Sequence, residues 1–463
     1  MKKVCWPYFD PDFDNLPERI NGPRQVDSVN EQDLLLEVVQ VLTDLNLSIV
    51  KGYISSDARW FMDVFHVKDE QGNKLTDQTM VNHIQKSIEV GRVNSNSSAR
   101  ARSNGKKAMF GSAQPIGTEH TAIEMTAADR PGLFSEISAT LADLHCNIVE
   151  AHAWSHNACL ACVAYISDQF SRNPIDDPLR LTSIEDHLTT VLRANPHIVD
   201  VHMKRQEVKT VDVHSGECTT ITNVERRLHQ LMLSVRDFDM PGFEPSTSPR
   251  SILKCGVDEE GLKAMVSIES CYQKGYSIVS VECRDRPRVI FDAVCTLIDM
   301  HYVISHASIS SHDGYAFQEY FIRHRDGKPL STECEKERVI KCLVAATERR
   351  VCEGVKLEMW ANNRVGLLSD ITRVLRENGL AVVRADVETQ GEKAINAFYV
   401  RDVSGKNVVD MEFVESMRRE MSPIYLHVKN EIRSTTGASS PHYFSLSNMV
   451  KSHLERFSQT SMQ

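Results

Sequence analysis

The sequence lacks any uninterrupted run of about 18 apolar residues, the length that a membrane-spanning helix needs, so no span is expected. Residues 1–14 include two lysines and three aspartates but no apolar core of the kind a signal peptide carries. These features predict a protein without membrane association and a cytoplasmic location, and the nucleus stays open as a second location because of a basic segment described below.

A disulfide framework is also missing, because the 12 cysteines of the 463 residues are scattered. The one Cys-x-x-Cys, Cys159 to Cys162, lies in an apolar run at 158–166 that reads as a strand. Residues three apart in a strand point to opposite faces, so this pair cannot converge on one metal ion or form a disulfide. We predict two buried core cysteines, no metal site and no cofactor.

Motifs for catalysis and for nucleic-acid binding are lacking too. No glycine-rich phosphate loop and no Ser-His-Asp set appears. Gly111-Ser112 is not followed by the paired aspartates that metal-dependent nucleotidyl transfer needs, and His312-Asp313 falls in a hairpin turn. The net charge of −10 argues against nucleic acid as a partner, and the predicted strand 159–167 has only one aromatic residue on which a base could stack. We therefore predict a protein that is not an enzyme.

What the sequence does contain is a repeated hexapeptide. Asp129-Arg130-Pro131-Gly132-Leu133-Phe134 recurs at 285–290 and 363–368, and a degraded copy lies at 30–35. The flanking residues keep the same register, since Asp44-Leu45, Asp143-Leu144 and Asp299-Met300 all align when Asp33, Gly132, Arg288 and Gly366 are superimposed. Four copies in register predict four structural modules.

Hydrophobic periodicity gives the fold of one module. In module two, alternation predicts strands at 119–128, 147–154, 159–167 and 197–203, and apolar spacing predicts helices at 133–144 and 181–193. This β-α-β-β-α-β order predicts an α+β, ferredoxin-like unit with both helices on one face of an antiparallel sheet. Small sheets leave their edges exposed, so we expect modules to pair into larger sheets, within the chain or across a homodimer.

The predicted domain boundaries follow from these modules. They are an N-terminal tail 1–23, module one 24–90 with a short first strand, a linker 91–117, module two 118–205, an insert 206–262, module three 263–352, module four 353–432 and a tail 433–463. The linker is basic and reads as a solvated segment, with a nuclear-import or nucleic-acid arm as the alternative. No strand that closes module three lies before module four, so the strand near Ala264 is expected to fill that edge.

These motifs resemble a known family. The turn Asp129–Leu133 and the helix end 141–148, Leu-Ala-Asp-Leu-His-Cys-Asn-Ile, are similar to the ACT domain, a small regulatory module that binds amino acids. Four such modules, with segments 37–49 and 53–67, resemble the plant ACT-domain repeat family, called ACR. The resemblance implies an amino-acid-binding sensor or regulatory protein with a free amino acid as ligand.

The repeated turn supplies a physical reason for such a site. Pro131 suits the first helical position, and Gly132 lets a ligand carboxylate approach the free N–H groups of the helix. Asp129 and Asn363 could cap the helix or accept from a ligand ammonium, although ordinary turn and capping chemistry explains the same residues. The predicted ligand-binding residues are Asp129, Arg130, Pro131, Gly132, Leu133, Asn147, Asn363, Arg364, Gly366 and Leu367.

The other two modules depart from this pattern. Asp33 and Arg288 stand where modules two and four have glycine, so modules one and three are expected to be structural partners only. Two alternatives stay open for the whole protein: a scaffold whose modules bind only proteins, and a regulatory partner of an enzyme. ACT repeats also resemble the C-terminal regulatory part of bacterial uridylyltransferases.

Overall fold

The computed structural model describes residues 30–57, 60–69, 72–73, 120–193, 207–211, 220–239, 264–350, 355–403, 411–421 and 424–429. The chain divides into two compact units. Modules one and three form the first unit, and modules two and four form the second. No helix in the described ranges is long and apolar enough to cross a membrane.

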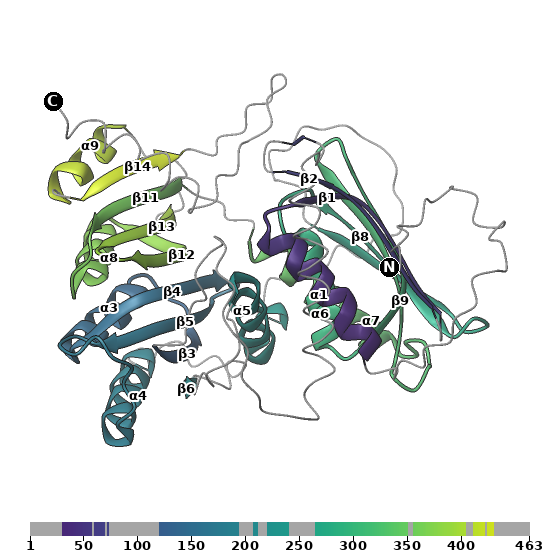
Figure 1. Cartoon of the computed structure of the whole chain (residues 1–463), viewed down its shortest axis with the longest axis horizontal. Coiled ribbons are helices and arrows are strands. Elements are labelled where there is room, and N and C mark those ends of the chain that lie inside the picture. Colours follow the sequence, from purple (N-terminus) through teal and green to yellow (C-terminus); the bar gives the residue numbers. More distant parts are fainter. Residues whose placement is uncertain are drawn as a thin grey trace, which may run out of the picture. The chain divides into compact units, whose positions relative to one another are not determined.

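The first unit is one antiparallel sheet of six strands with helices on one face (Figure 1). In spatial order the strands are β2 (Trp60–Lys68), β1 (Ser48–Asp57), β9 (Val303–His312), β10 (Tyr315–Arg323), β8 (Tyr276–Arg284) and β7 (Met265–Cys271). The helices are α1 (Asn30–Asp44), α6 (Val289–Asp299) and α7 (Glu333–Glu348). Strand β7 pairs with β8 and confirms the edge strand predicted near Ala264. The first strand and second helix predicted for module one, at 24–29 and 77–89, lie outside the described residues.

The second unit is an antiparallel sheet of eight strands. Their order is β14 (Tyr425–Lys429), β11 (Val355–Asn362), β13 (Lys393–Asp402), β12 (Leu380–Gln390), β4 (Cys146–His156), β5 (Cys159–Asp168), β3 (Thr121–Ala128) and β6 (Glu207–Val211). The helices of modules two and four are α3 (Leu133–Asp143), α4 (Pro178–Arg193), α8 (Leu367–Glu377) and α9 (Met411–Glu420). Modules two and four therefore each have the predicted ferredoxin-like strand order.

The modules pair edge to edge within the chain, as predicted. Strand β4 of module two lies antiparallel to β12 of module four, and His152 stands opposite Asp386. These two residues are 234 positions apart, the same interval that separates Gly132 from Gly366. Residues that are equivalent in the repeat thus face each other across the seam, so the pair has a pseudo-twofold axis there. Tyr53 and Ser308 occupy the corresponding position between β1 and β9.

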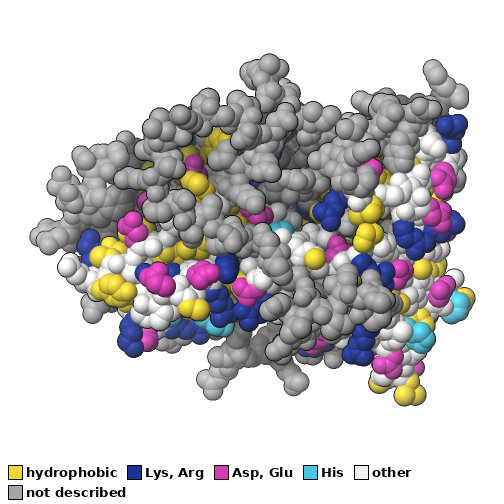
Figure 2. Space-filling model, turned by 180° about the vertical axis from the view of Figure 1, so that it is seen from behind, with side chains coloured by type: hydrophobic (Ala, Val, Ile, Leu, Met, Phe, Trp, Pro, Cys, Tyr) yellow, Lys and Arg dark blue, Asp and Glu magenta, His cyan; other side chains and the backbone are white. Residues whose placement is uncertain are grey.

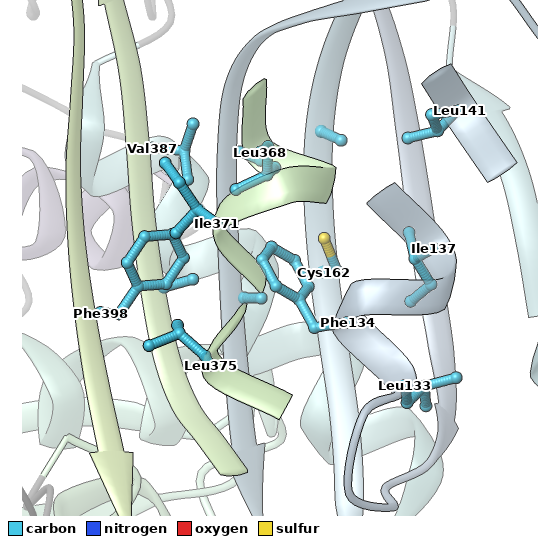
Figure 3. Close-up of a cluster of buried hydrophobic side chains, with 14 of the residues drawn as sticks. Leu133, Phe134, Ile137, Leu141, Cys162, Leu368, Ile371, Leu375, Val387 and Phe398 are labelled. Atoms are coloured by element: carbon cyan, nitrogen blue, oxygen red, sulfur yellow. The ribbon is translucent and has the colours of Figure 1, made fainter. Parts of the chain in front are cut away.

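The core of the second unit lies between helices α3 and α8 and the sheet beneath them. Figure 3 shows Phe134 of α3 next to Ile371 and Leu375 of α8, and Ile137 of α3 belongs to the same cluster. Cys162 points into this cluster, whereas Cys159 belongs to a second cluster on the opposite face of the sheet. The strand prediction for the cysteine pair is therefore confirmed.

That opposite face is covered by a helix from the insert, α5 (Ile221–Val235), whose role the sequence did not reveal. Its apolar stripe packs on Trp154 and its neighbours. After α5, the buried carboxylate of Asp237 accepts two hydrogen bonds of 2.7 Å from Arg349 and one of 2.9 Å from His156. Burial alone would raise the pKa of Asp237, but the charge of Arg349 and the hydrogen bonds from Arg349 and His156 outweigh it and lower the pKa to about 2. Arg349, which the sequence assigned to module three, thus anchors the insert to the second unit.

The edge strand of module two differs from the prediction. The sequence favoured 197–203, which lies outside the described residues, whereas the strand that pairs with β3 is β6, beyond the predicted boundary at 205. This segment alternates polar and β-branched residues, which suits a half-buried edge. Thr210 also ties it to helix α4, because its N–H donates to a Glu185 carboxylate oxygen at 2.7 Å.

A buried histidine holds the two modules together at the pseudo-twofold axis. The His152 ring contacts Asp386 through Nδ1 at 2.9 Å and Glu150 through Nε2 at 2.7 Å. Burial alone would lower the pKa of His152, but hydrogen bonds to these two carboxylates outweigh it and raise the pKa to about 10. Arg384 also contacts Asp386 and, with the histidine, holds the pKa of that carboxyl below its usual range. The seam is thus stabilised by an imidazolium between two acids.

We predict that His152→Gln destabilises the second unit in a pH-dependent way. The folded-state pKa of about 10 lies above the unfolded value of about 6.5, so the stabilisation is complete below pH 6.5. It is lost as the pH rises toward 10, by up to about 1.4 kcal/mol per pH unit. Urea unfolding should therefore show a larger difference between wild type and variant at pH 6 than at pH 9.

The matched control is His187→Gln, on the exposed side of α4. Its effect should stay below about 0.5 kcal/mol at both pH values, as for most surface substitutions. A pH-independent loss of stability in His152→Gln would show that folding does not shift the pKa of His152.

Candidate functional site

The repeated motif forms a type II β-turn before the helix. In module two the N–H of Leu133 donates to the carbonyl of Arg130 at 3.1 Å, with Pro131 and Gly132 at the two central positions. Gly132 has φ 85° and ψ −5°, in the left-handed region that a type II turn requires at this position. The helix begins at Leu133, so the prediction that Pro131 occupies the first helical position is wrong. Proline is favoured here because its fixed φ suits the second residue of the turn.

The same turn recurs in modules three and four, whereas Asp33 of the degraded copy lies within helix α1 of module one. Gly366 has φ 79° between Arg364 and Leu367, and Arg288 of module three has φ 71° at the equivalent place. A residue with a side chain is therefore tolerated there, at a cost of about 1–2 kcal/mol. The glycines of modules two and four keep the approach to the helix end free of a side chain at that point.

Neither helix is capped by a side chain. The N-cap residues of α3 and α8 are Gly132 and Gly366, and no side chain of the described residues bonds to the first turn of either helix as a cap. The capping role considered for Asp129 and Asn363 is therefore wrong. Asp129 instead accepts a hydrogen bond from the Ser155 hydroxyl, and burial raises the pKa of its carboxyl group. Both helix ends keep partial positive charge that could attract an anion.

The arginine of the motif has a structural role in module two. Arg130 makes a bidentate contact with Glu136 in the first turn of α3, at 2.6 and 2.5 Å, and donates to the carbonyl of Val191 at 3.2 Å. Module three repeats this arrangement, with Arg286 bound to Asp292 and to the carbonyl of Thr347. In both modules the guanidinium thus ties the turn to the end of the second helix.

Module four uses its arginine differently. Arg364 pairs with Asp370 in the first turn of α8, but the two side chains are 56% and 43% exposed. Arg364 also donates a hydrogen bond of 3.4 Å to the carbonyl of the neighbouring Val365. An exposed ion pair of this kind contributes little to stability, so the Arg364 guanidinium can turn toward a ligand at small cost.

Pairing of modules two and four produces two equivalent clefts beside the pseudo-twofold axis. Near the axis, the hydroxyls of Ser138 and Thr372 lie 2.9 Å apart, again at the repeat interval of 234 residues. Each cleft is lined by the turn and first helical residues of one module and by the helix and second strand of the other. The clefts exist only because the modules are paired.

The first cleft, here called the Asn396 cleft, has a space of about 370 Å³ including the part open to solvent. It brings together five of the predicted site residues, namely Asn147, Asn363, Arg364, Gly366 and Leu367. Its other lining residues are Ser138, Ala142, Cys146, Ile148, Leu368, Ser369, Val387, Thr389, Ala394 and Asn396. Among these lining residues Arg364 alone carries a formal charge.

Asn396 is the residue that the sequence reasoning missed. It lies on β13 between Ile395 and Ala397, is 2% exposed, and its side-chain Nδ2 has no hydrogen-bond partner among the described residues. A buried amide nitrogen without a partner costs about 1–3 kcal/mol, so its presence needs an explanation. The signal in the sequence was one polar residue inside the apolar run at 394–398. The equivalent residue of module two is Cys162.

The second cleft, here called the Arg376 cleft, contains Asp129, Arg130, Gly132 and Leu133 of the predicted residues. The remaining residues that line it are Phe134, Ser135, Ala153, Leu160, Thr372, Arg376, Leu380, Ala381, Val382 and Val383. Pro131 lines neither cleft. The Arg376 side chain lies over Gly132, where an added Cβ would stand only 2.7 Å from its Cδ. The equivalent position in the Asn396 cleft is Ala142, which leaves the end of α8 uncovered.

Surface charge gives no sign of a nucleic-acid site on the face shown in Figure 2. Acidic and basic side chains of the described residues are interspersed there, without a continuous basic stripe. The described residues also hold no cluster of three or more histidines, cysteines or acids suited to a metal ion.

Comparison with known proteins shows similarity to ACT domain-containing proteins over nearly the whole chain. Residues 24–95 match the family model described as the ACR family N-terminal ACT domain. The ACT domain-containing protein ACR2 of Arabidopsis thaliana is 57% identical, with 99% of both chains covered. ACR3 of the same plant is 46% identical over 94% of this chain and 93% of that protein. A bifunctional uridylyltransferase/uridylyl-removing enzyme of Pasteurella multocida is 26% identical over 29% of this chain and 19% of its own length.

The contact between Arg376 and Gly132 leads to a prediction about coupling. Gly132→Ala and Gly366→Ala should each cost about 1–2 kcal/mol, because both place a side chain in the left-handed region. Only Gly132→Ala also displaces Arg376. In urea unfolding, Gly132→Ala combined with Arg376→Ala should therefore show an interaction energy of at least about 0.5 kcal/mol.

The matched control pairs Gly366→Ala with Arg376→Ala. These residues lie in different clefts, so their effects should add within about 0.3–0.5 kcal/mol. Additivity in both cycles would mean that Arg376 does not rest on the module-two turn in solution.

Proposed function

Because the chain belongs to the ACR family of ACT domain-containing proteins, we propose that it is a non-catalytic sensor that binds a free amino acid in the Asn396 cleft. The observation that carries this proposal is the convergence of Asn147 from module two with the turn Asn363–Leu367 of module four at an uncapped helix end. These residues are far apart in the sequence, and the resemblance to ACT domains had selected all of them as ligand-binding residues.

The chemistry of the cleft suits the two charged ends of an amino acid. The first turn of α8 has N–H groups without a side-chain cap, and the exposed guanidinium of Arg364 lies beside it. Both can bind a carboxylate. The side-chain oxygens of Asn147, Asn363 and Thr389 line the same cleft and can accept hydrogen bonds from an ammonium group.

The Arg376 cleft is the weaker candidate, although it also contains predicted site residues. Its Gly132 is covered by Arg376, its Arg130 is engaged with Glu136, and its Asp129 accepts from Ser155. The groups that a ligand would need therefore already have partners from the protein itself. We propose that the pair of modules two and four binds one amino acid.

Calorimetric titration of the full chain with the free amino acids tests this proposal. We expect at least one amino acid to bind with a stoichiometry near one, and Gly366→Asp to weaken its binding. The new carboxylate would repel the ligand carboxylate by about 1–4 kcal/mol at contact distance, which is roughly ten- to a thousandfold in affinity. The fold should survive, because aspartate is among the residues that enter the left-handed region most readily.

The matched control is Gly132→Asp, which makes the same change in the Arg376 cleft and should leave the affinity within about twofold. Circular dichroism of both variants verifies that they are folded. If no amino acid produces binding heat with the wild-type protein, the alternative of a scaffold that binds only proteins replaces the sensor. Equal weakening by the two substitutions would place the ligand elsewhere than proposed.

A further inference from the structure

Asn396 supplies information about the ligand that the turn residues do not. We infer that its side-chain amide hydrogen-bonds to the ligand side chain and selects amino acids that carry a neutral hydrogen-bonding group. The carboxamides of glutamine and asparagine are the best match. This inference rests on the proposed function, because it assigns a ligand class to the same cleft.

The cleft has a polar mouth and a buried end. Arg364 is 56% exposed at the mouth, whereas Asn396 is 2% exposed. Apolar side chains line the cleft between the polar groups, including Ile148, Leu368 and Val387. This order matches an amino acid that enters side chain first, with its carboxylate and ammonium at the mouth and its methylene groups along the apolar walls.

A partner for the unpaired amide nitrogen can come from such a side chain. Nδ2 of Asn396 has no acceptor among the described residues. A ligand carbonyl or hydroxyl oxygen would supply one, whereas an apolar side chain would seal the amide away from water without a partner. Sites that contain buried polar groups discriminate strongly against analogues that cannot pair with them.

The charges that line the cleft narrow the class of ligand side chains further. Of the described residues that line the Asn396 cleft, Arg364 alone is charged. A carboxylate or ammonium on the ligand side chain would therefore lose its hydration at the buried end without an opposite charge to compensate. A carboxamide can both donate and accept, so it satisfies Asn396 in either orientation of the amide.

The Arg376 cleft has no equivalent of this feature. The position that corresponds to Asn396 is Cys162, a buried thiol in an apolar cluster, and the position that corresponds to Asn147 is Ala381. Two of the polar residues that could contact a ligand side chain or its ammonium, Asn396 and Asn147, are thus present in one cleft and missing from its counterpart. The difference favours a role for Asn396 in binding over a role in the pairing of the modules.

The test compares glutamine with norleucine, its apolar analogue of similar length, and with glutamate, by calorimetry on the full chain. We expect glutamine to bind roughly ten- to a hundredfold more tightly than norleucine, the range that corresponds to one unpaired buried amide. Glutamate should bind more weakly than glutamine. In Asn396→Leu, which has a similar volume, the preference for glutamine over norleucine should disappear, while norleucine binding is retained.

A measurement without ligand separates a binding role from a structural one. Because Nδ2 is unpaired, Asn396→Leu should leave the melting temperature unchanged or raise it, whereas a residue that holds the fold together by hydrogen bonds would lower it. Asn378→Leu, at the far end of α8, is the control for substitutions in module four and should keep the ligand preference.

The outcomes distinguish the inference from the function on which it rests. If norleucine binds as tightly as glutamine, or glutamate binds more tightly, the chain remains an amino-acid sensor and the role of Asn396 is refuted. A lower melting temperature of Asn396→Leu with an unchanged ligand preference refutes it as well. If none of the twenty amino acids binds, both the inference and the proposed function fail.

Discussion

The unpaired edge of each small sheet is the constraint on which the rest of the structure depends. A four-stranded ferredoxin-like sheet exposes the backbone groups of its second strand, and in this chain that strand always pairs with the second strand of another module, β1 with β9 and β4 with β12. In the second unit the pairing also brings α3 against α8, so that their apolar faces share one core. Both clefts lie along this junction, so the candidate site exists only in the paired state.

Fusion of the paired modules into one chain allows a contact that a symmetric dimer cannot make. At a true twofold axis a residue faces its own copy, and two like charges would repel each other. Here His152 faces Asp386 instead. The chain can therefore place opposite charges at the axis and stabilise the seam without a like-charge cost. The pair of β1 and β9 has Tyr53 opposite Ser308 at the same position, so the pair of opposite charges at the axis is specific to the second unit.

Much of this fold could be predicted from the sequence because its signals are local. The repeat register placed Gly132 and Gly366 in equivalent positions, and the strand pairing of the second unit follows that register to the residue. The position of Pro131 was misjudged because proline suits both the first residue of a helix and the second residue of a type II turn. Only the backbone angle of Gly132 decides between the two.

The features that could not be predicted depend on distant contacts. Arg376 reads as an ordinary residue of an amphipathic helix, because nothing near it in the sequence indicates that it lies over a glycine of another module. Asn396 is one polar residue in a strand, and alternation alone cannot say whether it faces solvent or a cleft. The helix of the insert was recognisable, but the sheet face that it covers was not, since its anchor Arg349 is 112 residues away from Asp237 and was assigned to the end of module three.

The differences between the two halves of the second unit are not spread evenly over the structure. Positions that build the turn and the helix contact are similar in both, as with Arg130 and Arg364, Gly132 and Gly366, and Ser138 and Thr372.

At three of the positions that differ, the Asn396 cleft is the more open or the more polar one. Ala142 opens the Asn396 cleft where Arg376 fills its counterpart, Asn147 is polar where Ala381 is not, and Asn396 replaces a buried cysteine. Unselected drift after duplication would be expected to alter the two clefts in unrelated ways. These changes open one cleft and make it more polar, and they close the other cleft with a side chain of the protein itself. A pair of modules specialised for one ligand requires such changes. The second cleft then serves as packing that supports the first.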